Sequence, residues 1–198
     1  ASVGAYRTRL GARGRTMLLA GTSVLGGGVG AVLLLHTPQA AFQRLIPYLL
    51  LLATLVFALS PHVTRWVRAR TGSTAGPSWR TLAAVAVAQL VIATYGGFFG
   101  AGIGILMLAS LGLMGMENIH DMNALKTVLA TCINGVAVVT FIIAGAVAWP
   151  QALVMIAGAI AGGFGGAYYA RRLDPLLVRR FVILVGAAMT LYFFVSYR

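Results

Sequence analysis

The sequence predicts an all-α, polytopic membrane protein with about six membrane segments arranged as a tandem helical repeat. Of its 198 residues, 60% are hydrophobic and only 9% are charged, whereas an ordinary globular domain is roughly 25% charged. A bilayer core about 30 Å thick needs roughly 20 apolar residues per helix. Stretches without Asp, Glu, Lys or Arg, each about long enough to cross, lie at 16–43, 45–64, 81–116, 127–170 and 181–197.

The net charge of +12 is concentrated in short basic segments between the apolar stretches, at 7–15, 65–80 and 171–180. Loops that meet anionic lipid headgroups have this pattern. No soluble fold stands behind these Arg residues to present a nucleic-acid surface. We therefore expect the lipid bilayer, and no nucleic acid, to be their partner. The positive-inside rule applied to six spans places both termini of a cell-membrane protein in the cytoplasm.

The third membrane segment is too long for a single crossing. As a continuous helix, 81–115 would reach about 52 Å, and its middle, from Tyr95 to Gly104, is rich in glycine. We expect a broken or re-entrant helix there. A turn is expected at 149–151, where Pro150 interrupts the apolar run. The six expected segments are 16–36, 41–60, 81–115, 122–149, 152–170 and 176–197.

An internal repeat links the first two segments to the last two. In each pair a glycine cluster, Gly26–Gly30 or Gly162–Gly166, precedes a second segment that is entered through an Arg. We therefore divide the chain into an incomplete first repeat, a connecting loop and a complete second repeat. The first repeat has two membrane helices and the second has four membrane segments. The predicted boundaries are 1–70, 71–80 and 81–198.

The glycine spacing is of the small-xxx-small kind, which lets membrane helices approach closely. Close packing is the expected role of the glycine pair at 26 and 30 and of the glycines at 158, 162 and 166. For the glycines at 96, 100 and 104, packing and a functional break both remain open. A broken helix at membrane depth presents backbone N–H groups that suit an anion.

Polar residues gather at the start of the fourth segment. Asn123, Lys126 and Thr127 have the i, i+3, i+4 spacing of one helix face, and Asn134 lies two further turns along on roughly the same side. One interpretation of Lys126 is an interfacial lysine that pairs with Glu117 or Asp121. The other is a fixed cation that faces a polar cavity and attracts an anionic substrate.

The sequence offers little for metal binding or catalysis. His120 with its two neighbouring acids is compatible with a proton relay or a metal pair, but a solvated loop explains the same residues. Cys132 lies in an apolar run, as a small buried residue does. We find no Ser–His–Asp set, Cys–His cluster or HExxH motif. We therefore expect no enzyme, no metal and no cofactor.

An ordered series of motifs resembles the second repeat of the sulfite exporter TauE/SafE family. The series runs from YGGFFGAGIG at 95–104 through NALKT at 123–127 to ARRL at 170–173. The resemblance implies a transporter of small anions, typically sulfite, other sulfur oxyanions or organosulfonates. Family members usually have two four-helix repeats, and this chain departs from that pattern in lacking the first two helices.

Our leading hypothesis is a secondary transporter or exporter of a small anion that works by alternating access. The alternative is a transport-inactive membrane subunit that scaffolds a larger complex. A homo-oligomer and a partner membrane subunit both remain open. The residues expected to bind the anion are Gly97, Gly100, Gly102, Gly104, Asn123, Lys126, Thr127 and Asn134.

Overall fold

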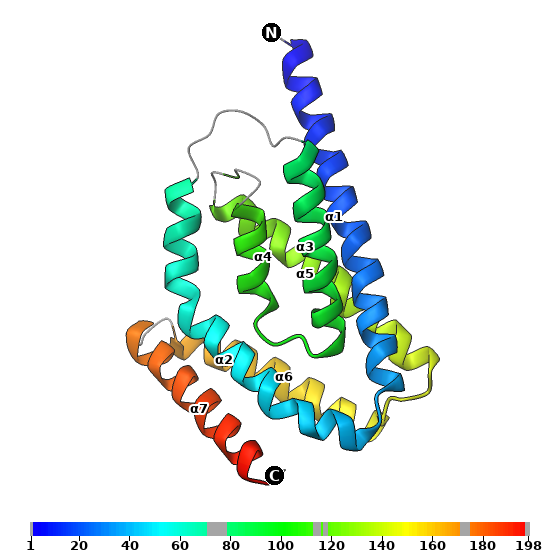
Figure 1. Cartoon of the computed structure of the whole chain (residues 1–198), viewed down its shortest axis with the longest axis vertical. Coiled ribbons are helices and arrows are strands. Elements are labelled where there is room, and N and C mark those ends of the chain that lie inside the picture. The colour runs from blue at the N-terminus through cyan, green and yellow to red at the C-terminus, as the bar shows by residue number, and fades with distance from the viewer. Residues whose placement is uncertain (1, 71–78, 113–115, 117–118, 171–174, 197–198) are drawn as a thin grey trace.

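The computed structural model describes residues 2–70, 79–112, 116, 119–170 and 175–196, which form seven α-helices and no strand. The all-α class predicted from the sequence is confirmed (Figure 1). Most of the predicted connecting loop, at 71–78, lies outside the described residues. The helices are α1 (Ser2–His36), α2 (Gln39–Arg70), α3 (Trp79–Phe98), α4 (Ile103–Gly112), α5 (Ile119–Ile143), α6 (Trp149–Ala170) and α7 (Pro175–Ser196).

Five helices in the described part of the chain contain a stretch long and apolar enough to cross a membrane. At about 1.5 Å per residue, stretches of 20 to 24 residues match the hydrocarbon thickness. The predicted segment at 152–170 lies in α6, whose last side chains fall outside the described residues, and its crossing stays a prediction. The five stretches are Gly14–His36, Gln39–His62, Trp79–Phe98, His120–Ile143 and Leu176–Val195.

The overlong third segment is broken, as predicted. α3 ends at Phe98, and after a four-residue turn the short α4 runs back along it (Figure 1). With 10 residues α4 is about 15 Å long, which is half the thickness of the hydrocarbon core. The α3–α4 unit is therefore a re-entrant hairpin.

The predicted turn at 149–151 is wrong: the structure places it at 144–148. Gly145 has φ 63° and closes α5, with its own N–H donating to the Ile142 carbonyl (3.0 Å) and the next N–H donating to the Phe141 carbonyl (3.0 Å). This pair of bonds is the usual glycine end of a helix. Pro150 instead lies in the first turn of α6, where a missing N–H removes no helical bond. The proline starts the next helix, and the glycine ends the previous one.

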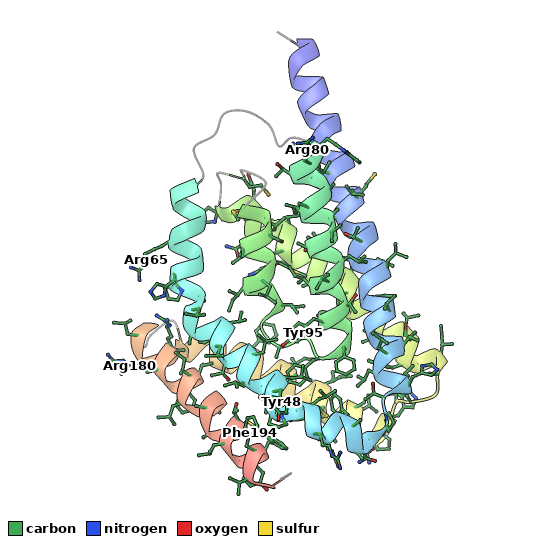
Figure 2. All side chains as sticks on the ribbon, viewed as in Figure 1. Tyr48, Arg65, Arg80, Tyr95, Arg180 and Phe194 are labelled. Atoms are coloured by element: carbon green, nitrogen blue, oxygen red, sulfur yellow. The ribbon has the colours of Figure 1, made fainter. Side chains whose placement is uncertain are left out.

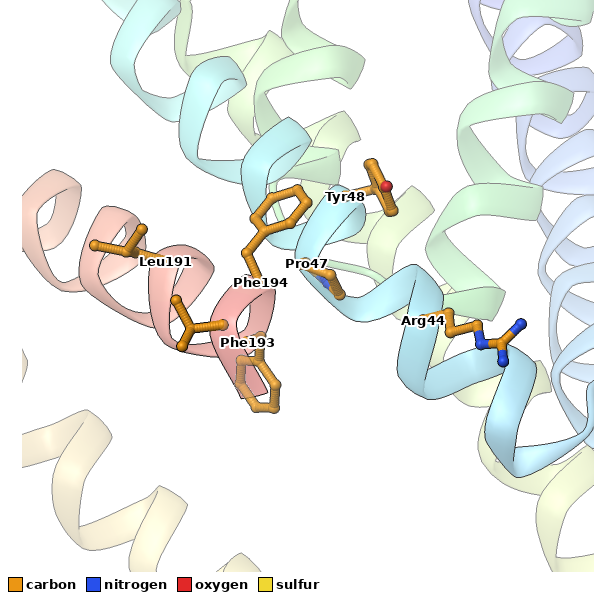
Figure 3. Close-up of a pocket in the computed structure, with 7 residues that line it drawn as sticks. Arg44, Pro47, Tyr48, Leu191, Phe193 and Phe194 are labelled. Atoms are coloured by element: carbon orange, nitrogen blue, oxygen red, sulfur yellow. The ribbon is translucent and has the colours of Figure 1, made fainter. Parts of the chain in front are cut away.

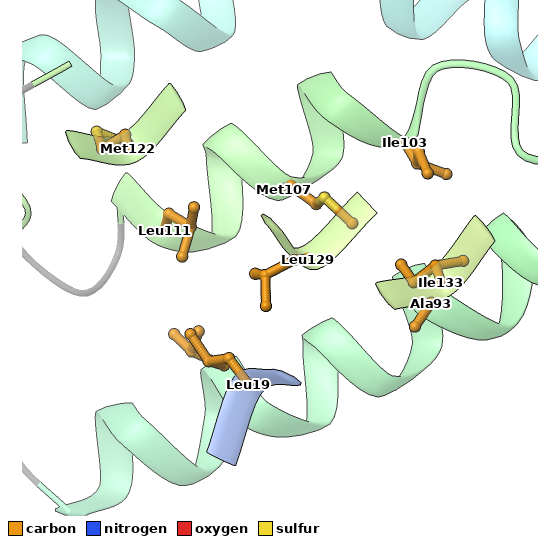
Figure 4. Close-up of a cluster of buried hydrophobic side chains, with 9 residues drawn as sticks. Leu19, Ala93, Ile103, Met107, Leu111, Met122, Leu129 and Ile133 are labelled. Carbon is orange, nitrogen blue, oxygen red and sulfur yellow. The ribbon is translucent and has the colours of Figure 1, made fainter. Parts of the chain in front are cut away.

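The main core lies between α1, α3, α4 and α5 (Figure 4). Lipid is as apolar as these side chains, so close packing, more than burial itself, holds the helices together. The closest approach is between α1 and α3, where a Cβ added at Gly30 would overlap the Thr94 carbonyl. The core side chains are Leu19, Val85, Ala93, Ile103, Met107, Leu111, Met122, Leu129 and Ile133.

Three helices lie outside this core. α2 bends on the way from Tyr48 to Arg65 (Figures 1 and 2), and Pro61 explains the bend because it has no N–H to donate and its ring crowds the preceding turn. α7 packs against α2. Nearly all described side chains of α6 are exposed.

Candidate functional site

The turn between α3 and α4 is held in one conformation by its own backbone. The N–H groups of Phe99 and Gly100 both donate to the Tyr95 carbonyl, at 2.8 and 3.1 Å. Gly100 (φ 82°) and Gly102 (φ 78°) adopt the left-handed conformation that other L residues avoid. The Tyr95 hydroxyl then donates to the carbonyl of Ala101 at 2.9 Å, which ties the tip of the turn back to α3. The glycine-rich sequence is therefore used for a fixed reversal of the chain.

Helix α2 supports this turn from outside the core. A Cβ added at Gly102 would lie 3.7 Å from both the Ala53 Cα and the Val56 Cγ1 of α2. The Phe42 and Phe98 rings add an edge-to-face contact with centroids 5.9 Å apart. The backbone of α2 therefore lies directly against the turn.

The first turn of α4 meets the only lysine of the chain. A Cβ added at Gly104 would lie 3.4 Å from the Lys126 Cδ and 3.9 Å from its Nζ. The first N–H groups of a helix have no partner within the helix and give that end a partial positive charge. Lys126, which is half-buried, thus lies beside the partly positive end of α4. An anion between them would be stabilised by both.

No carboxylate in the described part of the chain neutralises Lys126. Asp121 is exposed and forms no ion pair with it, and Glu117, the other predicted partner, lies outside the described residues. The predicted relay or metal pair around His120 is untested for the same reason. Among the described residues, no group of three His, Cys, Asp or Glu could hold a metal ion.

The structure brings some of the predicted site residues together and separates others. Asn123 is half-buried one turn before Lys126, and its carbonyl accepts a 2.8 Å hydrogen bond from the Thr127 hydroxyl. Thr127 and Asn134 are exposed, on the side of α5 that turns away from the core. Gly97 contacts the backbone of Gly27 on α1 and serves helix packing.

A model of the sulfite exporter TauE/SafE family matches residues 1–193. This chain belongs to that family. A probable membrane transporter protein of Haemophilus influenzae is 29% identical over 167 residues, which cover 84% of this chain and 62% of the relative. The chain therefore spans less than two thirds of that relative's length. No solved structure matches this TauE/SafE chain.

One polar pair in this TauE/SafE protein was not predicted from the sequence. Gln89 on α3 donates from Nε2 to the Ser23 Oγ on α1 at 2.9 Å, and both side chains are fully buried. The Gln89 Oε1 has no hydrogen-bond partner among the described residues. Two polar residues inside uncharged membrane segments are the signal that could have identified the pair, because such residues face the interior of a helix bundle.

Proposed function

We propose that the chain belongs to a secondary transporter that exports small anions by alternating access. The membership of the TauE/SafE family and the name of the Haemophilus relative support a transporter. The proposal of an anionic substrate rests on the contact between Lys126 and the first turn of α4. We infer that the chain lies in the cell membrane. Because the α3–α4 hairpin returns the chain to the side from which it enters, the placement of both termini in the cytoplasm stays a prediction. Reporter fusions at the two ends would test that orientation.

The site we propose has a fixed charge on one side and backbone donors on the other. Lys126 supplies the charge, and the N–H groups of Ile103 and Gly104 at the start of α4 supply donors that need no side chain, whereas the Ile105 N–H already donates to the Gly102 carbonyl. In a low-dielectric environment both attractions are stronger than in water. Gly104 and the lysine stem lie side by side, since even an added Cβ would be in ordinary van der Waals contact with Lys126.

We propose sulfite, related sulfur oxyanions or organosulfonates as substrates. Each presents several oxygen acceptors around a compact negative charge, which suits one ammonium and a fan of N–H groups. Asn123, half-buried one turn away on α5, is the nearest additional polar residue for substrate oxygens. Thr127 and Asn134 are proposed as contacts on the exposed side, met by the anion as it enters or leaves.

The turn also suggests how access alternates. It is fixed internally through Tyr95 and Ala101 but touches α2 only through van der Waals contacts at Gly102 and Phe98. We propose that α2, already bent near Pro61, moves relative to this rigid turn. The bound anion would then be reached from opposite sides in turn.

Flux of radiolabelled sulfite into proteoliposomes, with and without a pH gradient, tests the proposal. Lys126→Gln is expected to lower saturable uptake at least tenfold, with Lys126→Arg losing less. Arg65→Gln, which removes an exposed charge on α2 away from the turn, is the matched control and is expected to transport normally. Parent-level flux in folded Lys126→Gln would refute the role of this lysine.

A second candidate function is a membrane subunit that scaffolds a larger complex without transporting. The exposed glycine face of α6 favours it, because Gly158, Gly162 and Gly166 have no described atom within 4 Å of an added Cβ. Purification of a stoichiometric partner, together with absent flux from well-folded protein, would support this alternative over transport.

A further inference from the structure

Helices α2 and α7 form an antiparallel pair held at three levels. At one end an Nη2 of Arg179 donates to the Ala58 carbonyl (2.5 Å). In the middle, a Cβ added at Gly186 would lie 2.5 Å from the Thr54 Oγ1, so a larger residue there would require the Thr54 side chain to shift. At the other end the rings of Tyr48 and Phe194 meet edge to face, with centroids 5.1 Å apart.

A groove follows this helix pair. It consists of a cavity of about 460 Å³ and a second of about 660 Å³, which share the side chains of Leu191 and Phe194. The smaller cavity is lined by apolar groups from both helices, such as Leu55 and Ala187. The larger one opens beside Arg44 and Tyr48 (Figure 3).

The length of the groove matches one leaflet of a bilayer. From Ala58 to Arg44 the helix advances about 21 Å, and half of a bilayer with its headgroup regions is about 20–22 Å. Both volumes fall in the range of small-ligand sites, roughly 300–1,000 Å³. An apolar lining of this kind suits a hydrocarbon chain.

The open end of the groove carries a positive charge. Arg44 is an exposed residue that lines the larger cavity, and no acidic residue lines either cavity among the described residues. Guanidinium groups bind phosphate through two parallel hydrogen bonds. Tyr48 beside it has the apolar ring and polar tip that are typical of membrane interfaces.

We propose that the groove between α2 and α7 binds an anionic phospholipid, with one acyl chain along the apolar cavity and the phosphate on Arg44. The occupant follows from the apolar lining, the length of the groove and the exposed Arg44 that lines its larger cavity. At the opposite end Arg179 is already engaged with the α2 backbone. The site is independent of the proposed transport at Lys126.

The test measures binding of phosphatidylglycerol and phosphatidylcholine to the delipidated full chain by native mass spectrometry. Arg44→Gln is expected to weaken phosphatidylglycerol binding about fivefold, the effect of one basic residue near a membrane surface. It should weaken phosphatidylcholine binding less, because the choline cation offsets the charge of that lipid's phosphate. Ala187→Trp, which fills the apolar cavity from an exposed position, is expected to weaken both lipids. Arg65→Gln is the matched charge control, expected to bind as the parent does.

Two lipid-binding results would overturn the proposal. One is equal phosphatidylglycerol binding by Arg44→Gln and Arg65→Gln. The other is undiminished lipid binding in Ala187→Trp, with Leu191→Trp as the second filling variant if the first does not fold. Crosslinking of a second copy of the chain through Tyr48 or Leu191 at full yield would also contradict it, because a protein would then occupy the groove.

Discussion

In α1 the glycines at 26, 27 and 30 lie against the backbones of α3 and α5, whereas in α6 the glycines at 158, 162 and 166 have no described atom within 4 Å of an added Cβ. Both helices precede a helix entered through an Arg, and the sequence predicts close packing for both. That prediction is confirmed for α1. For α6, the described part of the chain provides no packing partner.

Glycine spacing therefore determines how closely another helix can approach, but it does not determine which helix that is. Small residues remove the side chains that would hold two backbones apart. The partner is decided by which helices the connections bring alongside, and here α3 and α5 lie beside α1. Whether the two helices are equivalent parts of a tandem repeat stays a prediction.

Of the substitutions that test this comparison, Gly30→Val is expected to lower the stability most. The new Cβ would overlap the Thr94 carbonyl and lie 2.8 Å from the Phe98 N, and backbone atoms cannot move aside. We expect a loss of about 3 kcal/mol or more, measured as unfolding by denaturant titration in detergent. Parent-like stability would mean that α1 and α3 do not meet as closely as described.

Gly27→Ala is expected to lower the stability less than Gly30→Val does. The added methyl would lie 2.9 Å from a Val136 methyl group and 3.0 Å from the Ile133 Cα, and the valine side chain can shift. Overpacking of this kind costs about 1–2 kcal/mol. The same titration measures it. A further Val136→Ala change should recover part of the loss, and no recovery would contradict the contact.

Ser23→Ala should cost about 1 kcal/mol, because it leaves the Gln89 amide N–H unpaired in the core. Adding Gln89→Leu should restore stability, since the Gln89 Oε1 already has no partner among the described residues. A double-mutant cycle in detergent checks both values. If Ser23→Ala alone proves neutral, the pair does not hold α1 to α3.

The smallest effect is expected from Gly162→Val, the same substitution placed on α6. With open space around it, the valine should change stability by no more than about 0.5 kcal/mol, in line with the modest difference in helix propensity. Comparison of its stability with that of Gly30→Val separates the cost of overpacking from the difference in helix propensity. A loss as large as that of Gly30→Val would reveal a partner for α6.

Much of the architecture was predictable because lipid imposes simple rules. The long uncharged stretches predicted membrane helices, and the overlong third stretch with its glycines predicted a break that the structure has at 99–102. The turn after α5 was misplaced because Pro150 was interpreted as the end of a helix, whereas Gly145 ends α5 and the proline starts α6. A residue's type allows both roles, and only the hydrogen bonds distinguish them.

The candidate site was predictable only in part. Spacing along one helix placed Asn123, Lys126 and Thr127 on one face, but it did not show that Lys126 would meet Gly104 on another helix. It also grouped Thr127 and Asn134 with Lys126, whereas the structure leaves these two exposed. Helical periodicity fixes angles about one axis and leaves open which neighbour lies at each angle.

By itself, then, the sequence determined that this TauE/SafE chain is helical, enters the membrane several times and reverses direction at a glycine-rich turn. These properties follow from local quantities: hydropathy, segment length and the backbone freedom of glycine. Three features depend on the tertiary structure: the glycines of α1 but not those of α6 pack against neighbouring helices, Lys126 meets the start of α4, and a groove forms between α2 and α7. Those outcomes depend on contacts between segments far apart in the chain.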